Sequence, residues 1–164
     1  MPKIATYKKW IKRACRFASD FQGRHTERHL DLCLYTILKQ SQFTVKRQYP
    51  VRGGRVDYIV YDGGNRDVVE LAVRTSKGLG AYNLERRKNE DELRKLMRIK
   101  NVARRILILA DLRAEGLSDK QLERLEKNYH AYKPQGRGDG RHSVRIVYGH
   151  AAYASSVIWK PNNR

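Results

Sequence analysis

The sequence is poor in cysteine and has no long hydrophobic run. Two of its 164 residues are cysteines, Cys15 and Cys33, which excludes a disulfide framework and favours a reducing, intracellular setting. The longest apolar run, residues 106–110, is far too short to cross a bilayer. The first residues alternate charged and apolar side chains and lack the hydrophobic stretch of a secretory signal. We therefore expect a protein of the cytoplasm or nucleoid with no membrane partner.

Acidic residues are also scarce. The chain has 17 Asp and Glu against 35 Lys and Arg, which gives a formal net charge of +18. The basic excess is spread along the whole chain, so a disordered basic arm is not expected. Such a charge is typical of proteins that bind polyanions, because cations that neutralise phosphates release the bound counterions. We expect a nucleic-acid partner, and DNA first.

No linker rich in Pro, Gly or Ser divides the chain, and its length is that of one domain, residues 1–164. Hydrophobic periodicity predicts a mixed α/β sheet flanked by helices, in the order α-α-β-β-β-α-β-α-β. Ser118 with Gln121 forms a capping box that predicts the start of the last helix. The predicted helices are 3–18, 25–40, 83–101 and 118–132, and the predicted strands are 43–49, 54–61, 66–75, 104–111 and 143–148, with 152–159 as a possible addition.

The most informative segment is a hairpin turn at residues 62–65, Asp-Gly-Gly-Asn. Counting outward from this turn places Asp57 directly opposite Glu70 and Arg55 opposite Ala72. The other face of the hairpin is then apolar and is expected to face the core. Its residues are Val56, Tyr58, Val60, Val69, Leu71 and Val73.

Two opposed carboxylates destabilise a sheet unless a positive charge lies between them. A divalent cation with oxygen ligands, Mg²⁺ or Mn²⁺, meets that need. The alternative is a surface lattice of salt bridges in which Arg55, Arg66 and Arg74 neutralise the pair. A third acid, Glu27, is predicted on the apolar face of helix 25–40, where it needs a partner.

A helical Glu27, a strand Asp57 in GGRVDYIVY and a Glu70 in VVELAVR together resemble the PD-(D/E)xK nuclease superfamily. The resemblance covers roughly residues 24–111. It implies the restriction-endonuclease-like fold, with 1–23 as a basic N-terminal helix and 112–164 as a C-terminal helix and strand extension. It also implies that Glu27, Asp57 and Glu70 hold the metal ion and form the catalytic site.

One position departs from the family motif, because Ala72 stands where the family has lysine. Arg74, on the same strand face, is the expected electrostatic substitute in the catalytic site, with Arg55 or Lys77 as alternatives. Arginine stays protonated and cannot act as a base. The residues expected to contact nucleic acid are Arg28, Arg55, Arg66, Lys77, Arg86, Arg87 and Lys88.

These features predict a DNA-binding protein that is a Mg²⁺-dependent endo- or exonuclease, a hydrolase of phosphodiester bonds. One alternative is a catalytically inactive nuclease-fold protein that binds DNA or blocks other enzymes. Another is a basic RNA-binding module, for which the opposition of Asp57 and Glu70 would be a coincidence. The sequence is also compatible with a homodimer.

Overall fold

The computed structural model describes residues 2–20, 27–75, 84–130 and 143–159, and its elements follow the predicted order. A single 3₁₀ turn, η2 (Arg86–Asn89), leads into α3. The helices are α1 (Ile4–Ser19), α2 (Glu27–Lys39), α3 (Glu90–Arg98) and α4 (Asp119–His130). The strands are β1 (Thr44–Val51), β2 (Gly54–Asp62), β3 (Asn65–Arg74), β4 (Arg104–Asp111), β5 (Val144–His150) and β6 (Ala154–Trp159).

The six strands form one sheet in which spatial order follows chain order, from β1 to β6. β1, β2 and β3 are joined by tight turns and pair antiparallel. β3, β4 and β5 pair parallel, because α3 and α4 carry the chain back between them. β6 returns antiparallel beside β5. The predicted mixed α/β sheet flanked by helices is therefore confirmed.

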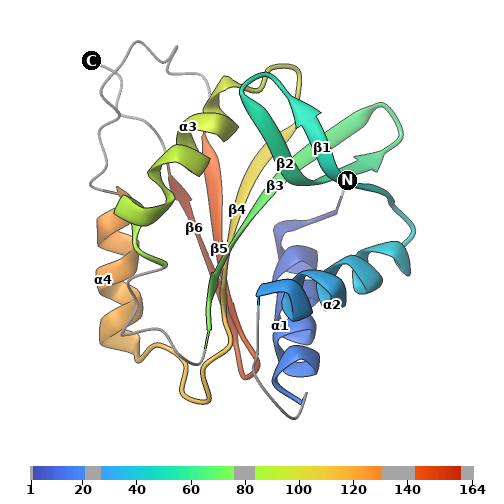
Figure 1. The fold of residues 1–164 in the computed structure, drawn as a ribbon. Coiled ribbons are helices and arrows are strands. Elements are labelled where there is room, and N and C mark those ends of the chain that lie inside the picture. Colours follow the sequence, from blue (N-terminus) through green and yellow to red (C-terminus); the bar gives the residue numbers. More distant parts are fainter. Residues whose placement is uncertain (1, 21–26, 76–83, 131–142, 160–164) are drawn as a thin grey trace.

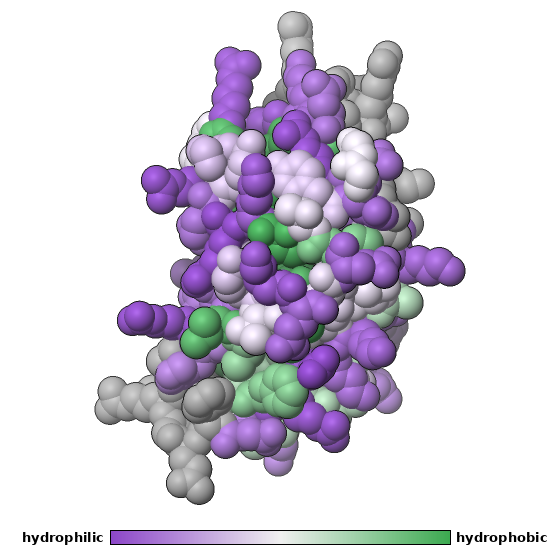
Figure 2. Space-filling model, turned by 90° about the vertical axis from the view of Figure 1, so that its right-hand side faces the viewer, coloured by the Kyte–Doolittle hydropathy of each residue, from purple (hydrophilic) through white to green (hydrophobic). Residues whose placement is uncertain are grey.

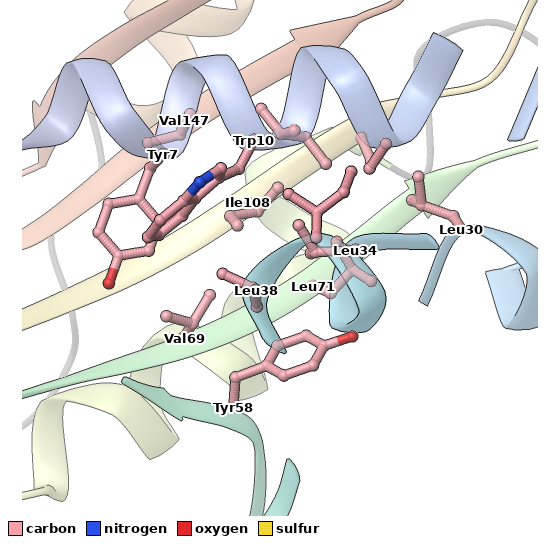
Figure 3. Packing of buried hydrophobic residues seen from close by; sticks show 14 of the residues in the cluster. Tyr7, Trp10, Leu30, Leu34, Leu38, Tyr58, Val69, Leu71, Ile108 and Val147 are labelled. Atoms are coloured by element: carbon pink, nitrogen blue, oxygen red, sulfur yellow. The ribbon is translucent and has the colours of Figure 1, made fainter. Parts of the chain in front are cut away.

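Helices cover both faces of the sheet, as Figure 1 shows. α1 and α2 lie on one face, where they bury a core around Tyr7, Trp10 and Leu34. Figure 3 shows these side chains meeting Val69 and Leu71 from β3 and others from β4 and β5. α3 and α4 cover the opposite face with a second apolar cluster. The central strands are buried on both sides, which explains their almost unbroken apolar sequences.

α1 approaches β5 so closely that a glycine is required there. A Cβ added at Gly149 would lie 2.5 Å from Ile11 Cγ2. At the other end of the helix, Tyr7 donates a hydrogen bond to the buried Asp67 at 2.8 Å. Arg104 donates to both oxygens of the same carboxylate. The N-terminal helix is thus fixed to three strands by both packing and charge.

Several element boundaries differ from the predicted ones for identifiable reasons. β1 continues through Pro50 to Val51, because it is an edge strand and needs no donor there. α3 is shorter than the predicted 83–101: residues 86–89 form the 3₁₀ turn η2 instead, and at the other end Arg105 of β4 donates to the carbonyls of Leu96 and Ile99. The capping box of α4 is confirmed, with Ser118 and Gln121 bonded reciprocally.

The face that carries α1 and α2 is mostly hydrophilic, and its apolar side chains form small separate areas (Figure 2). The large hydrophobic side chains exposed in the described residues are Phe17 and Leu32. Among the described helices, none combines the length and apolar character needed to cross a membrane. Hydrophilic side chains therefore predominate on this face.

Candidate functional site

The hairpin formed by β2 and β3 has the predicted register. Asp62 pairs with Asn65 across the turn, and the ladder runs without a slip to Tyr58 and Val69. Gly63 in the turn has a positive φ of 59°, which is the backbone conformation that glycine favours. The paired ladder ends at Tyr58, so the next positions, Asp57 and Glu70, are not backbone partners.

Asp57 lies where β2 leaves that ladder, and its carboxylate replaces the missing backbone acceptor. Its Oδ2 accepts a hydrogen bond from the Leu71 N–H at 2.8 Å. Its Oδ1 accepts one from Gln48 Nε2 at 3.0 Å. Gln48 has a φ of 49°, unusual for a residue other than glycine, so β1 is locally distorted beside Asp57. The two hydrogen bonds hold the Asp57 carboxylate at the point where the strands separate.

Because of this distortion, the prediction that Val56 and Tyr58 share one apolar face of the hairpin is wrong. Val56 does not share a face with Tyr58, since Val56 packs in the cluster under α3 and α4 while Tyr58 packs under α1 and α2. Regular alternation would put both on one face. The change of face occurs at Asp57, which is opposite the distorted Gln48. On β3 the alternation is regular, and Glu70 lies on the face opposite Val69, as predicted.

Glu70 is buried, with 3% of its surface exposed, and reaches α3. Lys95 Nζ lies 2.6 Å from Glu70 Oε1 and 2.6 Å from Glu92 Oε2. Both oxygens are buried, and within the described chain no well-aligned hydrogen bond reaches them. One ammonium therefore serves two carboxylates.

The surroundings of Glu70 disfavour the charged form of its carboxyl group, although Lys95 is close. Burial raises the pKa of Glu70 to about 9, and the charge of Asp57 adds to that effect, while Lys95 opposes it. Burial lowers the pKa of Lys95, but its close ion pairs with Glu70 and Glu92 outweigh this and raise it. A cation bound beside Glu70 would favour the charged form of this carboxyl and so lower its pKa.

Lys95 is the functional candidate that the sequence analysis missed. It comes from α3, in a part of the chain well separated from the motif strand. Its sequence signal is modest. Glu92 and Lys95 form an i,i+3 pair of opposite charge that flanks the buried Leu93 and Leu96. Only the packing of α3 on the sheet brings that pair to Glu70.

Glu27 opens α2 and faces a hollow of about 330 Å³ that Asp57 also lines. Its side chain is exposed, so its predicted place on the buried face of the helix is wrong. Partial burial raises its pKa, and the charges of Asp57, Asp31 and Glu92 raise it further. Glu27 thus lies in the electrostatic field of the other carboxylates.

Asp31, a second acid on α2, lines the same hollow and has a structural role. It forms an ion pair with Arg47 of β1 and accepts a hydrogen bond from the Tyr58 hydroxyl. Its backbone carbonyl accepts from the same hydroxyl at 3.1 Å. These contacts tie α2 to the β1–β2 hairpin and so position Glu27 relative to Asp57.

The expected substitutes for the motif lysine lie elsewhere. Arg74 is buried and ion-paired with Asp111, about 13 Å along the strand from Glu70. Arg55 pairs with Pro50 of β1 and is not opposite Ala72, because the β2–β3 ladder has already ended. Ala72 itself is buried in the cluster under α3 and α4. Lys77 lies outside the described residues.

The expected nucleic-acid contacts are scattered over several surfaces. Arg28 lines the hollow beside Glu27. Arg66 donates to the carbonyls of Lys100 and Asn101. The cluster Arg86, Arg87 and Lys88 forms η2, where Arg86 Nη1 lies 4.0 Å from Glu90 Oε2.

The acidic residues fit a hard divalent cation in chemistry and charge. All candidate donors are carboxylate oxygens, the ligands that Mg²⁺ prefers, and the charge of Asp57 acts on Glu70 in addition to the effect of burial. These carboxylates do not form a preorganised metal site. Among the described residues, no three potential ligands lie together in an arrangement that would hold an ion.

Comparisons with known proteins add one distant likeness. The chain matches no family model and no curated protein. It is similar to the solved structure of Pyrococcus furiosus SfsA in complex with Ca²⁺, with 10% sequence identity and a TM-score of 0.36. The match covers 82% of this chain, which spans 64% of that protein's chain. A likeness this distant says nothing about function.

Proposed function

We propose that this protein binds DNA and hydrolyses its phosphodiester bonds with Mg²⁺, as a divergent relative of the PD-(D/E)xK nucleases. The observation that carries the proposal is the contact between Glu70 and Lys95 beside Asp57. At this point a lysine lies beside the two strand acids of the motif, Asp57 and Glu70. The position at which the motif itself has its lysine is Ala72 in this chain. The net charge of +18 supplies the attraction to phosphates.

Asp57, Glu70 and Glu27 are the residues that would hold the ion. When bound, Mg²⁺ would polarise the scissile phosphate and lower the pKa of an attacking water. Lys95 then provides a fixed positive charge next to Glu70, in the role that the family gives to the lysine of its motif. The hydrogen bond from the Leu71 N–H keeps one Asp57 oxygen in place.

A second function, DNA binding without hydrolysis, is favoured by two observations. Lys95 is engaged by Glu70 and Glu92 at once, and no gathered ligand set is found among the described residues. A protein of this kind would use its basic surface alone. The same assay separates the two functions.

The test is cleavage of single-stranded, duplex and branched DNA with Mg²⁺ or Mn²⁺, measured at equal occupancy of the DNA by each variant. Asp57→Asn keeps an acceptor for the Leu71 N–H and removes the charge, so we expect cleavage to fall about 100-fold or more while binding persists. Lys95→Gln should reduce cleavage about 10- to 1000-fold. The matched control is Lys127→Gln, an exposed lysine that pairs with Glu123 on α4.

Equal residual cleavage by the wild type and Asp57→Asn would remove the proposed role of these carboxylates. Tight binding without cleavage by the wild type would favour the second function.

A further inference from the structure

A groove with a strongly basic rim lies next to the carboxylate site, between the β1–β2 end of the sheet and the end of α3. Its volume is about 410 Å³, within the range of small-ligand sites. The rim has four cations from three separate segments of the chain. They are Arg52 in the turn between β1 and β2, Arg66 on β3, Arg98 at the end of α3, and Lys100 just after it.

The charge of this rim is not cancelled locally. Arg52, Arg98 and Lys100 are exposed, and no described acidic side chain forms an ion pair with any of them. Arg66 donates to backbone carbonyls, which leaves its charge without a counterion there. Four such cations around one groove create a local potential that attracts an anion.

The rim is held in place before any ligand arrives. Arg66 Nε donates to the Asn101 carbonyl at 3.1 Å, and Asn101 has a φ of 57°, which turns the chain sharply after α3. Arg105 Nε donates to the Leu96 carbonyl at 2.9 Å from the other side. These bonds fix the segment that carries Arg98 and Lys100, so the segment loses less conformational freedom when an anion binds.

The floor of the groove is apolar and includes an aromatic ring. It is formed in part by Ile59 and Ile99, both buried, and by the half-buried ring of Tyr49. Lys46 Nζ lies 5.6 Å from the centre of that ring and adds another cation. Inorganic phosphate or the backbone of a duplex would use the rim and leave the floor without a partner. An unstacked base has the flat apolar surface that the floor fits.

We propose that this groove binds one nucleotide of a single-stranded nucleic acid, with its phosphates on the rim and its base against Tyr49. The inference rests on the proposed function and narrows its substrate to a strand that is single or separated from its duplex. Arg98 follows Lys95 by three residues on α3, so the two side chains are neighbours on one helix surface. The groove and the carboxylate site therefore lie along the same helix, α3.

The test is the affinity of the full chain for a fluorescent oligothymidylate of about 16 nucleotides and for a duplex of equal length, by anisotropy in EDTA. The double variant Arg98→Ala with Lys100→Ala should weaken single-strand binding at least 10-fold. It should also reduce the slope of log affinity against log salt by about 1.4. Tyr49→Leu should weaken it about fivefold or more, and Tyr49→Phe should not.

The matched control removes two exposed cations from the opposite face of the sheet, Lys12→Ala with Arg16→Ala on α1. Losses equal to those of the groove variant would overturn the inference, as would wild-type binding that is tighter for the duplex. Failure of the wild type to bind either DNA would overturn the proposed function instead. Single-strand binding that depends on the groove, without any cleavage, would support the inference and count against hydrolysis.

Discussion

In the proposed site, Lys95 supplies a positive charge beside Glu70 that the residue at position 72 does not supply. A lysine at Ala72 would have to enter the apolar cluster beneath α3, because Ala72 is buried there among hydrophobic residues. Lys95 reaches Glu70 from the opposite direction, with its side chain partly in solvent. Its stem lies 3.9 Å from the position of a Cβ on Gly54, so the start of β2 leaves space for it. Introducing lysine at position 72 should therefore destabilise the fold.

Glu70 gives the fold a measurable dependence on pH. Its pKa is raised to about 9 in the folded state, from an ordinary value of 4.5, so the folded protein holds a proton that the unfolded chain releases. Stability from this group is complete below about pH 4.5 and is lost as pH rises toward 9. We expect the free energy of unfolding to fall across that window by up to about 1.4 kcal/mol per pH unit.

Glu70→Gln should flatten this dependence, because glutamine does not ionise. The measurement is urea denaturation of the metal-free protein at several pH values between 5 and 9. The matched control is Glu123→Gln, an exposed residue of α4, which should leave the slope unchanged. A Glu70→Gln profile as steep as that of the wild type would show that Glu70 does not hold the proton.

At the scale of elements, the fit of α1 against β5 depends on the missing side chain of Gly149. Gly149→Ala places a methyl group 2.5 Å from Ile11 Cγ2 and 2.6 Å from Ile11 Cγ1, both buried. We expect a loss of about 1–3 kcal/mol in the free energy of unfolding, because the helix must move away from the strand.

Gly64→Ala is the control for this prediction. It lies in the turn between β2 and β3, where a Cβ meets nothing within 4 Å. Thermal or urea unfolding of both variants makes the comparison. Equal stability of the two would mean that α1 is not held as closely against β5 as the structure has it.

The sequence predicts local order well in this chain and predicts packing less well. The turn at residues 62–65 determines the register of β2 and β3, since a Gly-Gly turn leaves few alternatives. The change of face at Asp57 could not be predicted, because it accompanies a left-handed backbone at Gln48, and glutamine rarely adopts that conformation. The contact of Lys95 with Glu70 depends on how α3 docks on the sheet, which periodicity does not encode.

At the scale of the whole molecule, the net charge of +18 should dominate the thermodynamics of nucleic-acid binding. With about six or more phosphate contacts, affinity for DNA should fall about 1000-fold between 50 and 200 mM salt. Fluorescence anisotropy at four or five salt concentrations measures the slope. Affinity that does not change with salt would exclude a binding mode based on phosphates.

The close packing of α1 against β5 also constrains how the chain can fold while it is being synthesised. Strands that are neighbours in the sheet are neighbours in sequence, so β1 to β4 can begin to pair in the order in which the ribosome releases them. α1 precedes all six strands in the chain, yet Ile11 packs against Gly149 of β5, and Cys15 Sγ contacts the Gly149 carbonyl at 3.5 Å. Its seat does not exist until β5 has been translated. α1 can pack against α2 early, because both helices contribute to one apolar cluster, but its docking on the sheet is completed only when β5 has formed.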